Sequence, residues 1–268
     1  MIPYAFEYRR AKSLNDAQAI LSASPDAKLL AGGQTLIPAM KLRLASPPVL
    51  VDISGLKELS FIRASGDAIV IGAGTKHGVI GASADVKRAI AALAYMASHI
   101  GDPAVRAMGT LGGSLANNDP AADYPAAVLA LGATIKTTKR SIAADDFFTG
   151  MFSTALEDGE IITEVSFPIP ERAGYEKFRN PASRYPMAGV FVAKTKSGIR
   201  VAVTGAAPSV FRIEAMEAAL TKNFLPEVVA KIEIPADGLN SDIHASAEYR
   251  AHLVTVMAKR AVEAALRQ

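Results

Sequence analysis

Apolar residues near the start of the chain change from a helical spacing to a short continuous run. In the segment 13–24 they recur every three or four positions, which is typical of an amphipathic helix. Ser13, with Asp16 three places later, resembles a capping box at the start of this helix, and Pro25 indicates its end. The apolar run 27–31 then leads directly into Gly32-Gly33, so we expect a strand that ends in a glycine turn.

Further apolar runs predict strands in the middle of the chain, at residues 49–53, 68–71, 132–137 and 160–167. The alanine-rich segment 85–98 predicts a helix. Residues 100–125 are dense in Gly, Asn, Asp and Pro, so we expect a long loop there, and loops of this length are usually functional. Asp145-Asp146 before Phe147-Phe148 indicates a turn or a helix start rather than an acid–base pair.

The C-terminal part of the chain predicts a hairpin followed by helices. Residues 171–174 follow two prolines and indicate a linker. The runs 189–194 and 199–205 flank Lys196-Ser197-Gly198, which is typical of a β-hairpin. An apolar stripe at helical spacing predicts a terminal helix; it consists of Tyr249, Leu253, Val256, Met257, Ala261 and Ala264. Taken together, the elements predict an α+β protein.

Composition narrows the class of protein. The 268 residues, half of them hydrophobic, are enough for two domains with a sizeable core. The absence of cysteine excludes disulfides, thiolate zinc sites and cysteine-ligated iron–sulfur clusters in this chain. No stretch has the apolar length of a transmembrane span and residues 1–12 do not resemble a signal peptide, so we expect a cytoplasmic protein. The net charge of +3 is not gathered in a basic run, which argues against a nucleic-acid partner.

Two double-glycine segments carry the strongest candidate chemistry. Gly32-Gly33 precede Gln34 and Thr35, and Gly112-Gly113 lie between Thr110 and Ser114. Glycine lets a chain turn tightly and approach a ligand closely, so several backbone N–H groups can converge on a phosphate. Either pair alone is equally consistent with a simple tight turn. Two pairs, each with hydroxyls beside it, predict a clamp that holds a pyrophosphate from two sides.

Other phosphate and catalytic motifs are incomplete or absent. His77 occupies the place of the third glycine in the segment 72–77, so the dinucleotide fingerprint fails. Neither a P-loop nor a nucleophile elbow occurs. The four histidines form no close metal-ligand pair, so we expect no metal site and assign them structural or surface roles; they are His77, His99, His244 and His252.

The surroundings of the glycine pairs resemble the two FAD loops of a known family. The first loop corresponds to residues 31–38 with 41–43, and the second to residues 100–106 and 109–114, continued by 119–123. Residues 175–179 resemble the start of that family's C-terminal domain. The family is the flavoprotein (medium) subunit of the molybdenum hydroxylases, including aerobic carbon monoxide dehydrogenase and xanthine dehydrogenase. The resemblance extends over nearly the whole chain.

The resemblance implies a fold and a domain organisation. Residues 1–170 would form a FAD-binding domain of the vanillyl-alcohol-oxidase type, with subdomains over about 1–54 and 55–170. Residues 175–268 would form a smaller C-terminal flavoprotein domain, with a three-stranded antiparallel sheet beside helices.

The resemblance also implies roles for individual residues. The segments 31–35 and 110–114 correspond to the cradle of the pyrophosphate and ribityl chain, and Asp123 to an aspartate that hydrogen-bonds that chain. Lys177 corresponds to a lysine near the carbonyl end of the isoalloxazine, where positive charge stabilises reduced, anionic flavin. The expected FAD-binding residues are Ala31, Gly32, Gly33, Gln34, Thr35, Leu36, Gly74, Thr75, Thr110, Leu111, Gly112, Gly113, Ser114, Asn117, Asp123, Lys177 and Tyr185.

The function implied by the resemblance is electron transfer. A molybdopterin-binding large subunit would hydroxylate the substrate, and [2Fe-2S] clusters of a small subunit would pass electrons to FAD on this chain. The external acceptor would be NAD, a quinone or oxygen, and the assembly a dimer of heterotrimers. No residue of this chain would act as a general acid or base. Two alternatives stay open: a self-sufficient flavin oxidase or reductase, and a non-catalytic scaffold subunit that has lost FAD.

Overall fold

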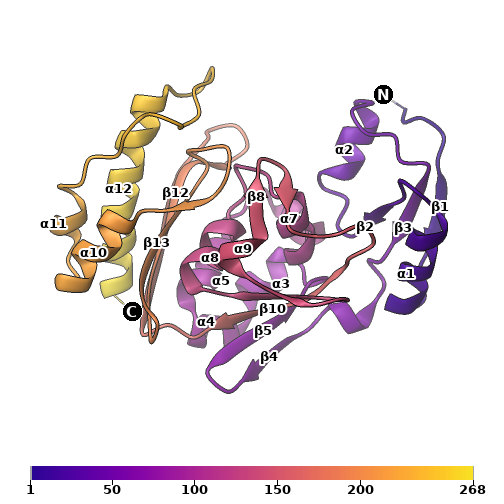
Figure 1. Cartoon of the computed structure of the whole chain (residues 1–268), viewed down its shortest axis with the longest axis horizontal. Helices are drawn as coiled ribbons and strands as arrows, with labels where there is room; N and C mark the ends of the chain where they lie inside the picture. The colour runs from indigo at the N-terminus through magenta and orange to yellow at the C-terminus, as the bar shows by residue number, and fades with distance from the viewer. Residues whose placement is uncertain (1, 268) are drawn as a thin grey trace.

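A computed structural model describes residues 2–267, and its three larger sheets follow one another along the long axis of the molecule (Figure 1). Met1 and Gln268, the outermost residues of the two expected domains, lie outside the described residues. Among the described residues, no helix is long and apolar enough to cross a membrane.

The N-terminal sheet has three parallel strands in the order β1-β3-β2. Its elements are β1 (Glu7–Arg10), α1 (Leu14–Ala23), β2 (Lys28–Leu30), α2 (Leu36–Lys41) and β3 (Val49–Asp52). The N-cap predicted at Ser13 is confirmed, because Ser13 Oγ accepts the Asp16 N–H; the Asp16 carboxylate accepts the N–H of Lys12, one residue before the N-cap, so the capping box is present in a shifted form. The strand before the first glycine pair is also confirmed.

The middle sheet has five antiparallel strands in the order β4-β5-β10-β6-β7. The strands are β4 (Ile62–Ser65), β5 (Ala68–Gly72), β6 (Thr134–Thr137), β7 (Ser141–Ala143) and β10 (Ile162–Pro168), with a separate hairpin of β8 (Phe148–Gly150) and β9 (Ser153–Thr154). The helices are α3 (His77–Ala82), α4 (Ala84–Ala89), α5 (Ala91–Ser98), α6 (Pro103–Met108), α7 (Leu111–Asn117), α8 (Tyr124–Leu131) and α9 (Ala144–Phe147), and the 3₁₀ helix η1 spans Lys57–Leu59.

The long loop expected over residues 100–125 is wrong, because α6, α7 and the start of α8 lie within it. Side chains begin the first two of these helices: Asp102 accepts the Val105 N–H at 3.0 Å, and Thr110 accepts the Gly113 N–H at 3.2 Å. Glycine is a poor helix former, so the glycine-rich composition concealed helices that depend on their caps. The single helix expected over 85–98 is divided at Ile90, whose φ of −143° is extended.

The C-terminal sheet has four antiparallel strands in the order β11-β12-β13-β14, where three were expected. Its elements are β11 (Arg172–Arg179), β12 (Pro186–Thr195), β13 (Gly198–Thr204), β14 (Phe211–Arg212), α10 (Glu214–Lys222), α11 (Pro226–Val229) and α12 (Ala247–Leu266). The fourth strand has only two residues, too few for an alternating pattern. The hairpin around Lys196-Ser197 is confirmed. The expected linker 171–174 is wrong, since β11 begins at Arg172.

Strand β12 is buried on both faces and joins the middle and C-terminal parts of the molecule. Phe191 and Ala193 belong to the core cluster of the middle sheet and α8, whereas Val190 and Val192 belong to the cluster under α12. Successive side chains of a strand point to opposite faces, which explains this division. The C-terminal sheet is therefore a layer between α8 and α12 (Figure 1).

Candidate functional site

The main cavity is a cleft of about 1380 Å³ that extends from the N-terminal sheet to the C-terminal sheet. Small-molecule sites usually measure about 300–1,000 Å³, so this cleft suits a long ligand. Fourteen of the expected FAD-binding residues line it: Ala31, Gly32, Gly33, Gln34, Thr35, Leu36, Gly74, Thr110, Gly112, Gly113, Ser114, Asn117, Asp123 and Tyr185. Thr75, Leu111 and Lys177 lie behind its wall.

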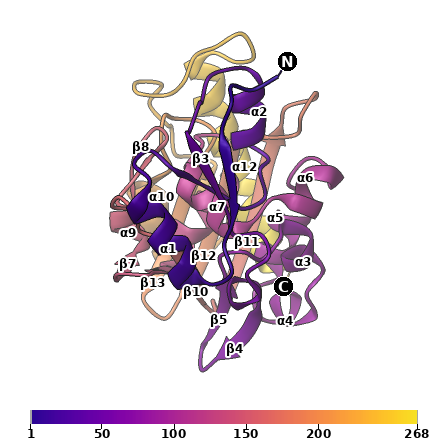
Figure 2. The same ribbon diagram turned by 90° about the vertical axis from the view of Figure 1, so that its right-hand side faces the viewer.

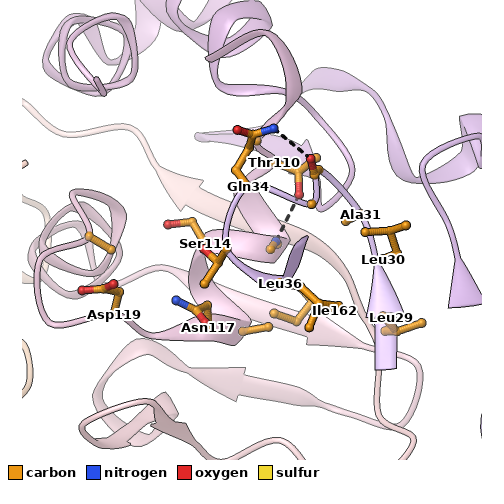
Figure 3. Close-up of a pocket in the computed structure, with 18 of the residues that line it drawn as sticks. Leu29, Leu30, Ala31, Gln34, Leu36, Thr110, Ser114, Asn117, Asp119 and Ile162 are labelled. Carbon is orange, nitrogen blue, oxygen red and sulfur yellow. Dashed lines mark hydrogen bonds between the residues drawn. The ribbon is translucent and has the colours of Figure 1, made fainter. Parts of the chain in front are cut away.

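The two glycine segments contact each other directly. A Cβ atom on Gly32 would lie 2.3 Å from the carbonyl oxygen of Met108 and 2.7 Å from the Cα of Gly109. Figure 3 shows the result, with Thr110 and Ser114 of α7 beside the loop that carries Ala31, Gln34 and Leu36. Segments far apart in the sequence thus form one side of the cleft.

Within each glycine pair the two glycines have different tasks. Gly112 packs against strand β5, because a Cβ there would lie 2.6 Å from the Cβ of Ala73, just as Gly32 packs against Met108. The second glycines meet only side chains: Gly33 meets Ile37 and Leu30 at 3.1 and 3.2 Å, and the nearest atom to Gly113 is Thr110 Oγ1 at 2.9 Å. The first glycine of each pair therefore lets two chain segments pack closely, whereas the second lines the cleft and contacts only side chains.

The first loop presents free backbone donors. Within residues 2–267, none of the backbone N–H groups of residues 32–35 donates a hydrogen bond to the protein. Gly33 has a φ of +71°, a left-handed conformation that glycine adopts without steric cost. Successive backbone N–H groups in such a turn form a concave anion site. This donor set fits the pyrophosphate of a dinucleotide.

The second loop contributes hydroxyls rather than backbone donors. The N–H groups of Leu111, Gly112 and Gly113 are already bonded to Thr75 O, Ala73 O and Thr110 Oγ1, respectively. Thr110 Oγ1 accepts in its bond, so its own hydrogen stays free to donate, and the Ser114 hydroxyl has no partner in the described part of the chain. The two-sided clamp expected from the sequence would thus offer amides on one side and hydroxyls on the other.

Thr75 and Leu111 support the cleft from behind. The Thr75 hydroxyl donates to Phe61 O at 3.0 Å and accepts the Phe61 N–H at 3.1 Å, so it is not free for a ligand. Leu111 is fully buried in the core, and its N–H bonds to Thr75 O. Both residues hold the strand end at β5 against the start of α7.

A buried ionic group lies where the cleft meets the C-terminal sheet. Asp123 Oδ1 accepts hydrogen bonds from Lys177 Nζ at 2.7 Å and from the Tyr175 hydroxyl at 2.6 Å. Burial raises the pKa of the Asp123 carboxyl, and Lys177 opposes that rise by its charge and its hydrogen bond. Asp123 lines the cleft and Lys177 does not, so the aspartate stands between the lysine and any ligand in the cleft.

Tyr185 borders the cleft from a short loop that closes on itself. Its hydroxyl accepts a hydrogen bond from Asn180 Nδ2 at 3.0 Å, and its carbonyl accepts the Asn180 N–H at 2.9 Å. Its ring lies edge-on to His244, with centroids 6.4 Å apart. Asn180 thus fixes the tyrosine at the rim of the cleft.

His77 differs from the other histidines because it is buried and lines the cleft. Its ring packs on Tyr124, with centroids 5.3 Å apart, and its Nδ1 has no hydrogen-bond partner among the described residues. Burial lowers the pKa of His77 to about 4. The imidazole of His77 is therefore neutral near pH 7. Among residues 2–267, no three or more His, Asp or Glu side chains are grouped so that they could hold a metal ion.

Several residues of the site were not identified from the sequence. Apolar side chains line the cleft beside the first glycine loop, among them Leu29, Leu30 and Ile162 (Figure 3). At the opposite end of the cleft Arg250 is buried and donates to Met187 O at 2.6 Å and Gly205 O at 3.0 Å. Apolar strand residues look alike whether they face a core or a cleft. Tyr175 carried a signal that was missed, since it lies two positions from Lys177 and so on the same face of one strand.

Comparison with known proteins assigns the family. Residues 4–170 match the family model described as the FAD binding domain in molybdopterin dehydrogenase, and residues 180–265 match the CO dehydrogenase flavoprotein C-terminal domain. The carbon monoxide dehydrogenase medium chain of Hydrogenophaga pseudoflava is 38% identical and covers 99% of this chain and 98% of its own length. The nicotine 6-hydroxylase medium subunit of Paenarthrobacter nicotinovorans is 37% identical, with 96% of each chain covered.

A solved structure agrees with these matches. The structure of quinoline 2-oxidoreductase from Pseudomonas putida 86 superimposes with a TM-score of 0.91 at 30% identity, covering 100% of this chain and 99% of that one. These findings confirm the resemblance noted in the sequence: the chain belongs to the FAD-binding medium subunits of the molybdenum hydroxylases, a family of oxidoreductases.

Proposed function

We propose that the cleft holds FAD with its pyrophosphate between the free amides of residues 32–35 and the hydroxyls of Thr110 and Ser114. The free amides carry this proposal, because exposed donors in a left-handed glycine turn are suited to an anion and to little else. Asp123 has its second carboxylate oxygen, Oδ2, left for a ligand hydroxyl, since the two described bonds both end on Oδ1. The other expected cleft-lining residues would contact the remaining parts of the cofactor.

Lys177 would act on the flavin through Asp123 rather than by direct contact. Its ammonium is bonded to the carboxylate and lies behind the cleft wall. In this arrangement the lysine opposes the effect of burial on the pKa of Asp123 and orients the carboxylate. The role expected from the resemblance, direct stabilisation of reduced flavin by Lys177, would require the side chain to move when the cofactor binds.

The chain would work as the electron-transfer subunit of a larger complex. Bound FAD supplies the redox chemistry, taking electrons from iron–sulfur clusters of a small subunit and passing them to NAD, a quinone or oxygen. Because this chain has no cysteine, thiolate-held clusters must lie on a partner. The names of its relatives, medium chain and medium subunit, support a large and a small partner, and a dimer of heterotrimers in the cytoplasm remains the expected form.

Copurification tests the proposed assembly. A tagged chain isolated from its native cells should bring two further chains, together with FAD, molybdenum and iron in fixed ratios. A chain that purifies alone with FAD and oxidises a substrate by itself would favour the self-sufficient flavoenzyme. A complete complex without FAD would favour the scaffold subunit.

A further inference from the structure

The tip of the β8–β9 hairpin carries an exposed aromatic residue at the cleft. Phe152 is 57% exposed and lines the cleft, although large apolar side chains are usually covered. Its neighbour Met151 is exposed to a similar degree, at 52%, but does not line the cleft. The hairpin therefore presents one apolar side chain to the ligand space and one away from it.

The backbone of Phe152 is held in an unfavourable conformation. Its φ is +52°, in the left-handed region that non-glycine residues rarely adopt. Such conformations persist only where the surrounding structure enforces them, and they concentrate at functional sites. A glycine at this position would avoid the steric cost, and the phenylalanine found there instead points to a use for its ring.

Asn118 enforces this conformation from the end of α7. Its side-chain amide donates to Gly150 O at 2.8 Å and to Ser153 O at 2.7 Å, on either side of the hairpin tip. Its carbonyl accepts the Phe152 N–H at 3.2 Å. Asn118 is itself buried and left-handed, with a φ of 42°, and it caps the C-terminus of α7. These three hydrogen bonds to Asn118 therefore hold the backbone of the hairpin tip in place.

Helix α7 connects the hydroxyls of the proposed phosphate site to Asn118, which holds the hairpin that carries Phe152. Thr110 is the N-cap of this helix, Ser114 lies in its middle and Asn118 is its C-cap, and the seven helical residues span about 10 Å. A dinucleotide places its flat rings beyond sugar units on either side of the diphosphate. One end of the helix would hold the diphosphate, and the other would place Phe152 near a ring.

We propose that Phe152 packs against a flat heteroaromatic ring of the bound dinucleotide, either the flavin or the adenine. The inference rests on the proposed FAD site and adds a residue that holds a ring rather than a phosphate. An aromatic side chain can stack on either ring, because every heteroaromatic ring has a π-face.

The test compares binding by the full-length chain and its variants. Phe152→Ala should weaken FAD binding by roughly 5- to 150-fold, the effect of removing one base-stacking aromatic. Phe152→Leu, apolar but not flat, should recover little of this affinity, and Phe152→Tyr should recover most of it. Met151→Ala is the matched control and should bind FAD as the wild type does. The melting temperatures of the ligand-free variants should stay close to one another.

Titrations with ADP and riboflavin identify the ring. If Phe152 covers the adenine, Phe152→Ala weakens ADP binding in parallel with FAD; if it covers the flavin, ADP binding is unchanged and only flavin ligands are affected. Unchanged FAD affinity in Phe152→Ala, full recovery in Phe152→Leu, or an equal loss in Met151→Ala would overturn the inference while leaving the FAD site intact. A folded wild-type chain that takes up no FAD would overturn both.

Discussion

Lys177 Nζ donates to Asp123 Oδ1 over 2.7 Å, and this buried ion pair joins strand β11 to the start of α8. It lies between the cleft and the layer of strands that connects the middle and C-terminal parts. Buried pairs contribute little net stability, but removing one partner leaves an uncompensated charge. The pair therefore links the cleft wall at Asp123 to the packing of the C-terminal sheet.

Replacing the aspartate tests this coupling. Asp123→Asn should lower the free energy of unfolding by about 3–5 kcal/mol, because Lys177 is left charged and buried. Asp67, paired with Lys196 on the surface, provides the control. Asp67→Asn should change stability little in the same urea titration. Equal effects of the two substitutions would show that the Asp123 pair is not buried as described.

Tyr175→Phe tests whether the tyrosine hydroxyl orients Asp123, because it leaves the charges of Asp123 and Lys177 in place. The substitution removes only the 2.6 Å hydrogen bond to Asp123 and keeps the ring packed near Phe191. A lost hydrogen bond to a charged group costs about 1.5–3 kcal/mol, less than the loss expected for Asp123→Asn. FAD affinity should fall as Asp123 loses its orientation, measured by titration at a temperature where the variant is fully folded. Unchanged affinity would mean that Tyr175 has no positioning role.

The glycines of the two loops should respond differently to alanine. Gly32→Ala should lower the free energy of unfolding by about 1–3 kcal/mol, since its Cβ meets backbone atoms of Met108 and Gly109. Gly113→Ala should lower it less, because its Cβ meets only the side-chain atom Thr110 Oγ1 within 3 Å and alanine favours the helix, yet it should weaken FAD binding.

Gly150→Ala serves as the control for Gly113→Ala. Gly150 does not line the cleft, and the nearest atom to its Cβ would lie 3.9 Å away. Thermal melts and FAD titrations of the three variants together test the division of tasks. A loss of stability in Gly113→Ala as large as that in Gly32→Ala, or normal FAD binding by Gly113→Ala, would contradict that division.

His77 should make the protein sensitive to acid. Its pKa is about 4 in the folded chain and near 6.5 in the unfolded chain, so the unfolded state binds the proton more readily. The contribution is complete above pH 6.5 and is lost as the pH falls towards 4, a change of about 3 kcal/mol. Urea titrations across this range should show that His77→Gln flattens the decline. A variant with the same pH dependence as the wild type would contradict this account of His77.

The sequence predicted the elements whose signals are local. The helix capped by Ser13 and the hairpin around Lys196-Ser197 follow from adjacent residues alone, and both are present. The helices α6 and α7 were missed because each depends on one capping side chain in a glycine-rich segment. The start of α7 also changes the site, since its amides are bonded to Thr75 O, Ala73 O and Thr110 Oγ1 and are not left for a ligand.

Contacts between distant segments could not be predicted. Nothing local shows that Gly32 packs on Met108, or that Asn118 fixes the turn before Ser153. The resemblance gave the candidate residues, and fourteen of them line one cleft, but only the structure separates Thr75, Leu111 and Lys177 from that set. Whether these residues bind FAD stays a prediction.

Ligand retention by the purified chain tests the central claim most directly. The full-length chain should be mixed with FAD or with riboflavin, passed through a gel-filtration column, and its visible spectrum recorded. Because the free amides of residues 32–35 are proposed to hold the pyrophosphate, FAD should elute with the folded chain at one per chain and riboflavin should be lost. A folded chain that releases FAD, or that retains riboflavin as tightly as FAD, would contradict the account.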